Sequence, residues 1–258
     1  MLNYFYLFFK AMNLASSAGI NDIPLVAEPK GEGIITDIPI NYWLMPKNNR
    51  LTIKLFQPSE KPSDSGEAKV EAMIYIADPN SEFPKPGEVL AKFEWPGKGE
   101  PGTYPYILDM PFDITGPIYT SLWREAGRIE SVTDEDKISI LNLAEKLRRA
   151  LLNKEAEKAY SLLEYRYTDE AWAENKDPER IRSVVIGQYH WMFGFGDLTA
   201  DPLTIGNSEF AIVGDNRLVH VRHKNYHPAI TLKHEESGHF FGIPVYAARI
   251  KGKWIIAR

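Results

Sequence analysis

Residues 133–151 read TDEDKISILNLAEKLRRAL and decide the architecture of the second half of the chain. The stretch begins with Thr133, and an acid stands three positions later, which is the pattern of a helix N-cap. Acidic side chains in a first turn also favour the helix dipole. Apolar residues then recur at spacings of three and four, at Ile140, Leu143, Leu147, Ala150 and Leu151. We therefore predict a long helix with one apolar face.

Two further helices are expected downstream. One covers about 155–165 and runs into a charged stretch that we interpret as a solvated helix end, made of Glu164, Arg166, Asp169 and Glu170. The next begins at Asp177 and Pro178, because proline suits the first helical position and aspartate caps it. Gly194 and Gly196 should end it.

From Leu203 onward the pattern changes to short strands. Strands are predicted at 209–213, 217–223, 229–235, 240–250 and 253–257. The first two flank a Gly214–Asn216 turn and should form a hairpin. Pro244 inside the fourth strand indicates an edge or a bulge.

This order of helices and strands resembles the nuclear-transport-factor-2-like (NTF2-like) family, an α+β cone whose helices pack into a curved sheet. The resemblance covers 134–258 and rests on the cap at 133–136, the helix near 181–189 and the tail 246–256, YAARIKGKWII, which resembles the family's final hairpin. It implies either an isomerase or dehydratase with acid–base groups in the cone, or a binding or dimerisation module. Fold alone does not choose between them.

The first half of the chain has a different composition. Fourteen of the 18 prolines precede residue 118, and residues 1–130 carry 12 basic and 17 acidic residues, against 18 of each afterwards. Strands are predicted at 50–56, 69–76, 89–95 and 106–110, separated by proline-rich loops at 58–66, 78–87 and 96–105. We therefore predict an α+β protein: an N-terminal antiparallel β-sandwich at 31–117, a linker with a short helix at 118–133, and an NTF2-like α+β cone at 134–258.

Residues 1–30 are expected to form a separate N-terminal segment with two interpretations. The run LNYFYLFF at 2–9 and the small residues at 15–18 would suit a secretory signal, which would place the protein in the periplasm or outside the cell. Alternatively, the segment docks onto the folded body of a cytoplasmic protein. The run is too short to cross a membrane, which takes about 20 apolar residues.

Composition excludes several functions. A net charge of −5 and a pI near 5.8 argue against a nucleic-acid binder, which needs a concentrated basic face. The chain has no cysteine, so disulfides, thiolate metal sites and cysteine nucleophiles are absent. All six histidines lie between His190 and His239, but His220 and His223 should point to opposite faces of a strand. We expect no metal site and no cofactor.

Four residues are candidates for acid–base chemistry. His190 and Asp197 would form a pair near the mouth of the cone, and His220 and Arg222, which share a strand face, would lie opposite them. In the competing interpretation the aromatic residues of 189–193 are core and fill the hollow. Tyr189, Trp191 and Tyr246 are the candidate binding residues.

We therefore expect a non-enzymatic binding protein, an inhibitor- or immunity-type partner of another protein or a binder of a small-molecule ligand. The acidic charge would suit a basic partner surface. The alternatives are an NTF2-like isomerase, dehydratase or hydrolase that uses the four candidates, and a scaffold that forms a homodimer. No nucleic-acid partner and no transmembrane span are expected.

Overall fold

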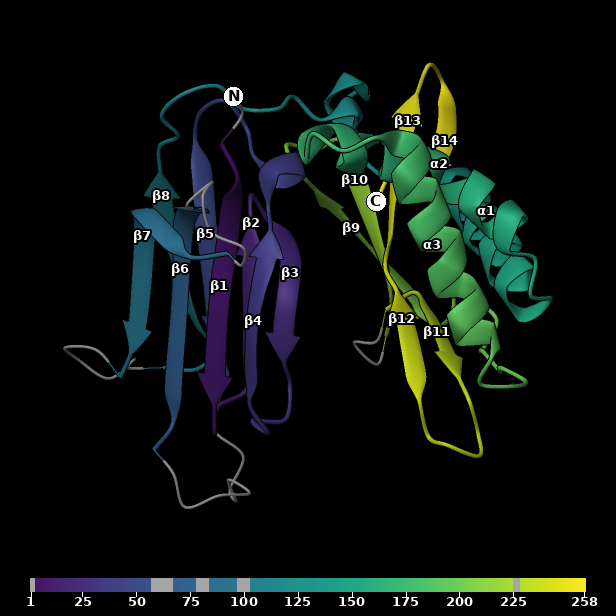
Figure 1. Ribbon diagram of the computed structural model, residues 1–258, viewed down its shortest axis with the longest axis horizontal. Coiled ribbons are helices and arrows are strands. Elements are labelled where there is room, and N and C mark those ends of the chain that lie inside the picture. The colour runs from purple at the N-terminus through teal and green to yellow at the C-terminus, as the bar shows by residue number, and fades with distance from the viewer. Residues whose placement is uncertain (1–2, 57–66, 78–83, 97–102, 225–227) are drawn as a thin grey trace. The chain divides into compact units, whose positions relative to one another are not determined.

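The computed structural model describes residues 3–56, 67–77, 84–96, 103–224 and 228–258. The chain divides into two compact units, Met1–Thr120 and Ser121–Arg258. Within the described residues the fold is mixed α+β: every named strand pairs antiparallel, and all three α-helices belong to the second unit (Figure 1).

The first unit is built from two four-stranded antiparallel sheets. Their strand orders are β4-β1-β6-β7 and β3-β2-β5-β8 (Figure 1). The strands, with one 3₁₀ turn η1 (Asn41–Trp43), are β1 (Phe5–Met12), β2 (Ser16–Ile20), β3 (Ile23–Glu28), β4 (Ile34–Pro39), β5 (Asn49–Leu55), β6 (Lys69–Ala77), β7 (Pro86–Trp95) and β8 (Tyr106–Phe112). The prediction of an antiparallel β-rich first half is confirmed, whereas most of the three predicted loops lies outside the described residues.

The N-terminal run is a strand inside this unit and does not form a separate segment. In β1 the alternate residues Phe5, Leu7, Phe9 and Ala11 are fully buried, and the strand lies between β4 and β6. With β2 and β3 it places residues 5–28 in the same unit as the later strands. The expected boundary at residue 31 is therefore wrong, because alternating aromatic and aliphatic side chains bury one face of a strand.

The second unit places its three helices before six strands. After a 3₁₀ turn η2 (Leu122–Glu125) come α1 (Asp134–Leu152), α2 (Ala156–Ala173), α3 (Pro178–Phe193), β9 (Ser208–Val213), β10 (Leu218–His223), β11 (Ile230–Lys233), β12 (Phe240–Ile243), β13 (Val245–Ile250) and β14 (Lys253–Ile256). The strand order is β14-β13-β10-β9, and β11 and β12 form a separate hairpin. Pro244 separates β12 from β13, where the sequence indicated an irregularity.

The predicted helix starts are confirmed. Thr133 caps α1 in a capping box, in which its hydroxyl oxygen accepts a hydrogen bond from the Asp136 backbone amide at 3.2 Å. Asp177 caps α3 by accepting the Glu179 amide at 3.1 Å, with Pro178 in the first turn. The second helix is longer than predicted, because α2 continues to Ala173 through the charged stretch.

The expected linker at 118–133 is divided between the two units, since residues 118–120 fall in the first and residues 121–133 in the second. The Gly127 amide donates to the Arg249 carbonyl at 3.3 Å, and the Ile129 amide donates to the Asn216 carbonyl at 2.7 Å. Its helical part is only the short η2 turn. These backbone bonds join residues of 121–132 to β13 and to the turn between β9 and β10.

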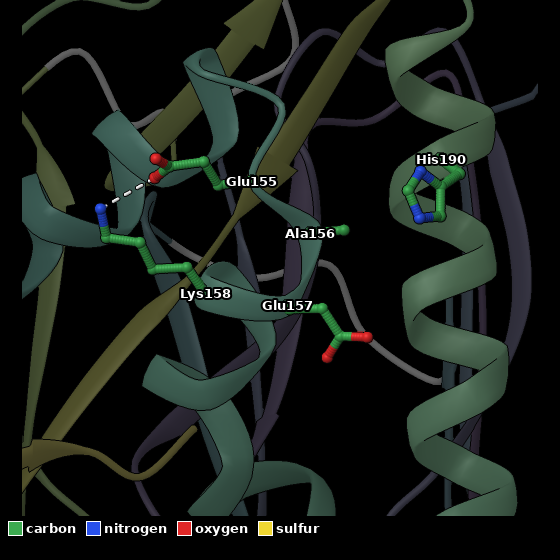
Figure 2. A pocket seen from close by; sticks show the side chains of 5 residues that line it. All are labelled: Glu155, Ala156, Glu157, Lys158 and His190. Atoms are coloured by element: carbon green, nitrogen blue, oxygen red, sulfur yellow. Dashed lines mark ion pairs between the residues drawn. The ribbon is translucent and has the colours of Figure 1, made fainter.

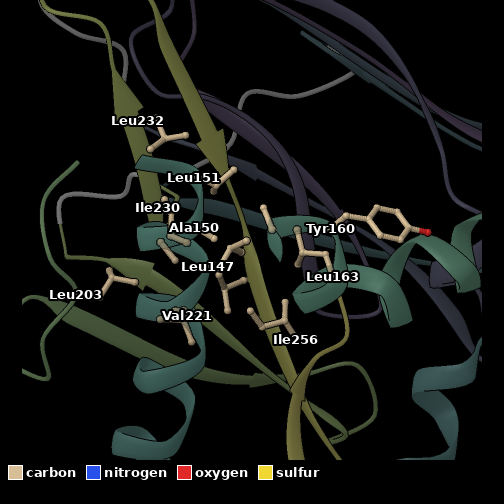
Figure 3. Close-up of a cluster of buried hydrophobic side chains, with 14 of the residues drawn as sticks. Leu147, Ala150, Leu151, Tyr160, Leu163, Leu203, Val221, Ile230, Leu232 and Ile256 are labelled. Carbon is tan, nitrogen blue, oxygen red and sulfur yellow. The ribbon is translucent and has the colours of Figure 1, made fainter. Parts of the chain in front are cut away.

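The helices of the second unit pack on one face of its sheet. Leu147 and Leu151 of α1 and Leu163 of α2 are fully buried in one cluster with Val221 and Ile256 of the sheet (Figure 3). Burying large aliphatic side chains in this way is the main stabilising contribution, about 1.5–3 kcal/mol each. The space between helices and sheet is filled by side chains, and this cluster decides which strand residues can face the helices.

Candidate functional site

His220 and Arg222 lie on the sheet face that the helices do not cover. On β10, Val219 and Val221 belong to the core beneath the helices, and successive strand residues point to opposite faces. His220 and Arg222 therefore point away from α1, α2 and α3. The expectation that they line a hollow beneath the helices is wrong.

On that face, His220 stacks on Tyr246 and Arg222 forms an ion pair. The His220 and Tyr246 rings are 4.3 Å apart and nearly parallel, at 13°. Burial, with a smaller contribution from the nearby Arg222 charge, lowers the pKa of His220 to about 4, so the ring is neutral at pH 7. The Arg222 guanidinium holds Glu209 at 2.7 Å. Tyr246 is buried and contacts this histidine.

His190 and Asp197 do not form the expected acid–base pair. His190 is exposed in the last turn of α3. Asp197 is fully exposed and pairs instead with Lys154, at 3.4 Å. A solvated carboxylate with another partner does not orient an imidazole, so the four predicted acid–base residues are not brought together.

His190 borders a shallow pocket at the start of α2. The pocket has a volume of about 320 Å³ and is lined by Glu155, Ala156, Glu157, Lys158 and His190 (Figure 2). Its charges are compensated: Lys158 pairs with Glu155 at 2.9 Å, and Glu157 pairs with Arg182 at 2.7 Å. The pocket is wide open to solvent and lacks the polar convergence that catalysis in a closed site needs.

The aromatic run at the end of α3 divides between interior and surface. Tyr189 is only 7% exposed, and its hydroxyl lies 3.2 Å from that of Tyr167. Burial and the Tyr167 hydroxyl raise the pKa of Tyr189 far above its ordinary value. Tyr189 is therefore part of the core, as the competing interpretation held, and it is not accessible to a ligand.

Trp191, by contrast, is 63% exposed and is part of an aromatic cluster. Its ring lies 4.9 Å from Phe195 and 5.8 Å from Phe241, both edge-on. Phe195 also lies 4.9 Å from the ring of His239 and 6.5 Å from that of His234. We call these five residues the aromatic patch: Trp191, Phe195, His234, His239 and Phe241.

Two structural elements position the patch. Trp191 is in the last turn of α3 and Phe195 is two residues beyond its end, while the other three come from the β11–β12 hairpin; Figure 1 shows these elements. The loop after α3 is joined to this hairpin by two backbone bonds between Thr199 and Lys233, both at 2.8 Å. The patch therefore rests on paired backbone, although its rings are at the surface.

Ser237 links the two histidines of the patch. Its hydroxyl lies 2.7 Å from Nδ1 of His234 and 2.7 Å from Nδ1 of His239. The backbone amide of Ser237 also donates to Nδ1 of His234, at 3.1 Å. The turn between β11 and β12 is thus fixed by hydrogen bonds that converge on one hydroxyl.

Metal-ligand chemistry and membrane spanning find no support in the described part of the chain. No three histidine or acidic side chains there lie close enough to hold a metal ion. None of the described helices combines the length and the apolar composition needed to cross a membrane.

Comparison with known proteins gives no match: no family model, no curated protein and no solved structure is similar to this chain. Function must therefore be inferred from the surface and its chemistry.

The sequence identified Trp191 as a candidate binding residue. It did not predict that Trp191 belongs to a cluster formed with Phe195, Ser237, His239 and Phe241. The available signals were the Phe195 between two glycines and the aromatic pair at 240–241, which follows a turn. Neither signal shows that the two segments meet. Their contact depends on how the hairpin packs against the end of α3.

Proposed function

We propose that this chain is a non-enzymatic binding protein and that the aromatic patch of its second unit is the contact site for a protein partner. The observation that carries the proposal is the 63% exposure of Trp191 within a cluster of ordered rings. A tryptophan in this position leaves a large apolar surface in water.

The physical support comes from the chemistry of interfaces. Tryptophan and other aromatic residues are enriched at protein interfaces and supply much of their binding energy. The edge-on packing of Trp191 against Phe195 and Phe241 restrains its ring before binding, which reduces the entropy lost on association. Phe240 is even more exposed, at 74%, but it alternates with Phe241 on β12 and so faces the other side of the hairpin.

The NTF2-like resemblance of the second unit also stays a proposal, supported by three helices that pack on one face of an antiparallel sheet. An enzyme of that kind needs its acid–base groups in one cavity. His190 and Asp197 are on the surface near the end of α3, whereas His220 and Arg222 are on the sheet face opposite the helices. The binding proposal requires no such convergence.

The test is affinity capture from the source organism with three versions of the purified chain: unaltered, Trp191→Ala and Trp172→Ala. Trp172 is a matched control, since it is also exposed, at 48%, but lies on α2. We expect quantitative mass spectrometry to find a protein retained by the unaltered chain and by Trp172→Ala but lost with Trp191→Ala. Equal recovery with all three, or no specific recovery, would contradict the proposal. Self-association that depends on Trp191, seen by light scattering, would point instead to the dimerising scaffold.

A further inference from the structure

We infer that the aromatic patch recognises a basic segment of its partner and that an arginine side chain is the group it binds. The inference rests on the proposed function, because it names the chemistry of the partner at the same site. Three features of the patch support it: ring surfaces, an imidazole acceptor and flanking carboxylates.

The rings offer a surface for a cation. A guanidinium within about 6 Å of an aromatic ring face is attracted by the ring quadrupole, most strongly by tryptophan. Trp191 meets Phe195 and Phe241 at 89° and 85°, so in each pair one ring presents its edge to the other. Because the ring is largely exposed, part of its surface stays open to a partner side chain.

The hydrogen bonds around Ser237 determine the proton positions of the two histidines. The Ser237 amide donates to Nδ1 of His234, so this nitrogen is an acceptor. At 2.7 Å the Ser237 hydroxyl must also donate to it. The hydroxyl then accepts from His239, whose Nδ1 carries the hydrogen. Neutral His239 therefore has its lone pair on Nε2, a hydrogen-bond acceptor of the kind that an arginine N–H needs.

Acidic side chains flank the patch. Asp197 is fully exposed two residues beyond Phe195, and Glu235 and Glu236 are exposed in the hairpin turn. Glu235 is tied to the loop after α3 through the Thr199 hydroxyl, at 3.0 Å. Residues 194–199 and 233–241 carry one lysine, Lys233, and no arginine, while Lys154, between α1 and α2, pairs with Asp197. The acidic excess attracts a basic segment and disfavours an acidic one.

The same chain already holds an arginine in this way elsewhere. The Arg249 guanidinium lies 4.7 Å from the Trp254 ring centroid and forms an ion pair with Asp136. Trp254 donates its indole N–H to that carboxylate at 3.0 Å. A tryptophan and a carboxylate thus bind one guanidinium within the second unit; the patch presents a tryptophan at the surface, and exposed carboxylates flank it.

The experiment uses four fluorescein-labelled peptides of equal length in which glycine alternates with arginine, lysine or glutamate, or serine with leucine. Fluorescence anisotropy measures their binding to the full chain. We expect the arginine peptide to bind most tightly, and Trp191→Ala to weaken it by about tenfold or more. Trp172→Ala should leave it unchanged.

Two variants separate the other contributions. His239→Phe keeps a ring but removes the acceptor nitrogen, and we expect about threefold to tenfold weaker binding. The double variant Asp197→Asn and Glu236→Gln should weaken binding by about twofold to fivefold and reduce its dependence on salt. Circular dichroism of each variant verifies that the helices are intact.

No binding of the arginine peptide, or equal binding by Trp191→Ala, would overturn the inference. Tighter Trp191-dependent binding of the leucine or glutamate peptide would also overturn it, yet would leave the proposed function standing. Affinity capture from the lysate tests the proposed function without using these peptides, so either experiment can fail while the other succeeds. The two experiments therefore distinguish a failure of the proposed function from a failure of the inference that the partner segment is basic.

Discussion

Tyr189 and Trp191 are two positions apart on α3 but have opposite surroundings. Tyr189 is buried against Tyr167 and Phe193, whereas Trp191 is largely exposed and lies edge-on to Phe195 and Phe241 of the patch. A rotation of about 200° separates two such positions on a helix. One aromatic run therefore contributes side chains to both the interior and the surface. We expect substitutions in the interior to lower the free energy of unfolding strongly and substitutions in the patch to change it little.

The largest stability effect is expected at a buried ion pair of the interior. Arg258 and Asp169 pair while both are almost fully buried, and Asp169 also accepts the Leu122 amide at 2.8 Å. Asp169→Ala removes the buried carboxylate of the pair and leaves the guanidinium the more distant Glu170, at 3.7 Å, so we expect the free energy of unfolding to fall by about 3–5 kcal/mol. Urea unfolding followed by helical circular dichroism measures this in the second unit. Glu209→Ala is the control, since its pair with Arg222 is half-exposed and should cost about 1 kcal/mol or less.

Substitutions of Tyr189 and Trp191 test the difference between interior and surface positions on a single helix. Tyr189→Ala should lower the free energy of unfolding by about 3–4 kcal/mol, because it opens a cavity and leaves the Tyr167 hydroxyl without this partner. Trp191→Ala should change it by about 0.5 kcal/mol or less. Similar losses in the two variants would mean that Trp191 belongs to the packed structure.

His220, on the sheet face opposite the helices, predicts a dependence of stability on pH. The folded state lowers the pKa of His220 to about 4, mainly through burial. An unfolded histidine titrates near 6.5, so the unfolded state binds more protons between these values. The stability contributed by neutral His220 is nearly complete above about pH 6.5 and falls by about 3 kcal/mol toward pH 4. His220→Phe should flatten this part of the stability profile, and an unchanged profile would show that His220 does not cause it.

Among the stability losses expected outside the aromatic patch, the smallest is at the start of α1. Thr133→Ala removes one half of the capping box and should cost about 1 kcal/mol. Thr133→Ser is the matched control, because serine preserves the cap. A loss equal to that of alanine in the serine variant would exclude capping as the reason.

Local patterns predicted the elements of the second unit well. The cap at Thr133, the Asp177–Pro178 start of α3 and the hairpin of β9 and β10 all depend on neighbours in sequence, and all are present. The apolar face of α1 was predicted less exactly: Leu143 is only partly buried, while Leu141 and Ala144 are buried.

Features that depend on distant partners were missed. The charged stretch on α2 was interpreted as solvated, but Asp169 is buried because Arg258, 89 residues away, pairs with it. The orientation of His220 had a local signal, since Val219 and Val221 are apolar and alternate with it. The aromatic patch had a local signal in each of its two segments but none for their contact, because Phe195 and Phe241 meet through the packing of a hairpin on a helix end.

The most direct test of the central claim is the affinity of the arginine peptide for the Trp191→Ala chain, measured together with the stability of that chain. We predict unaltered stability and an affinity reduced by about tenfold or more. An unaltered affinity in a fully folded Trp191→Ala chain would contradict the assignment of the aromatic patch as the binding surface.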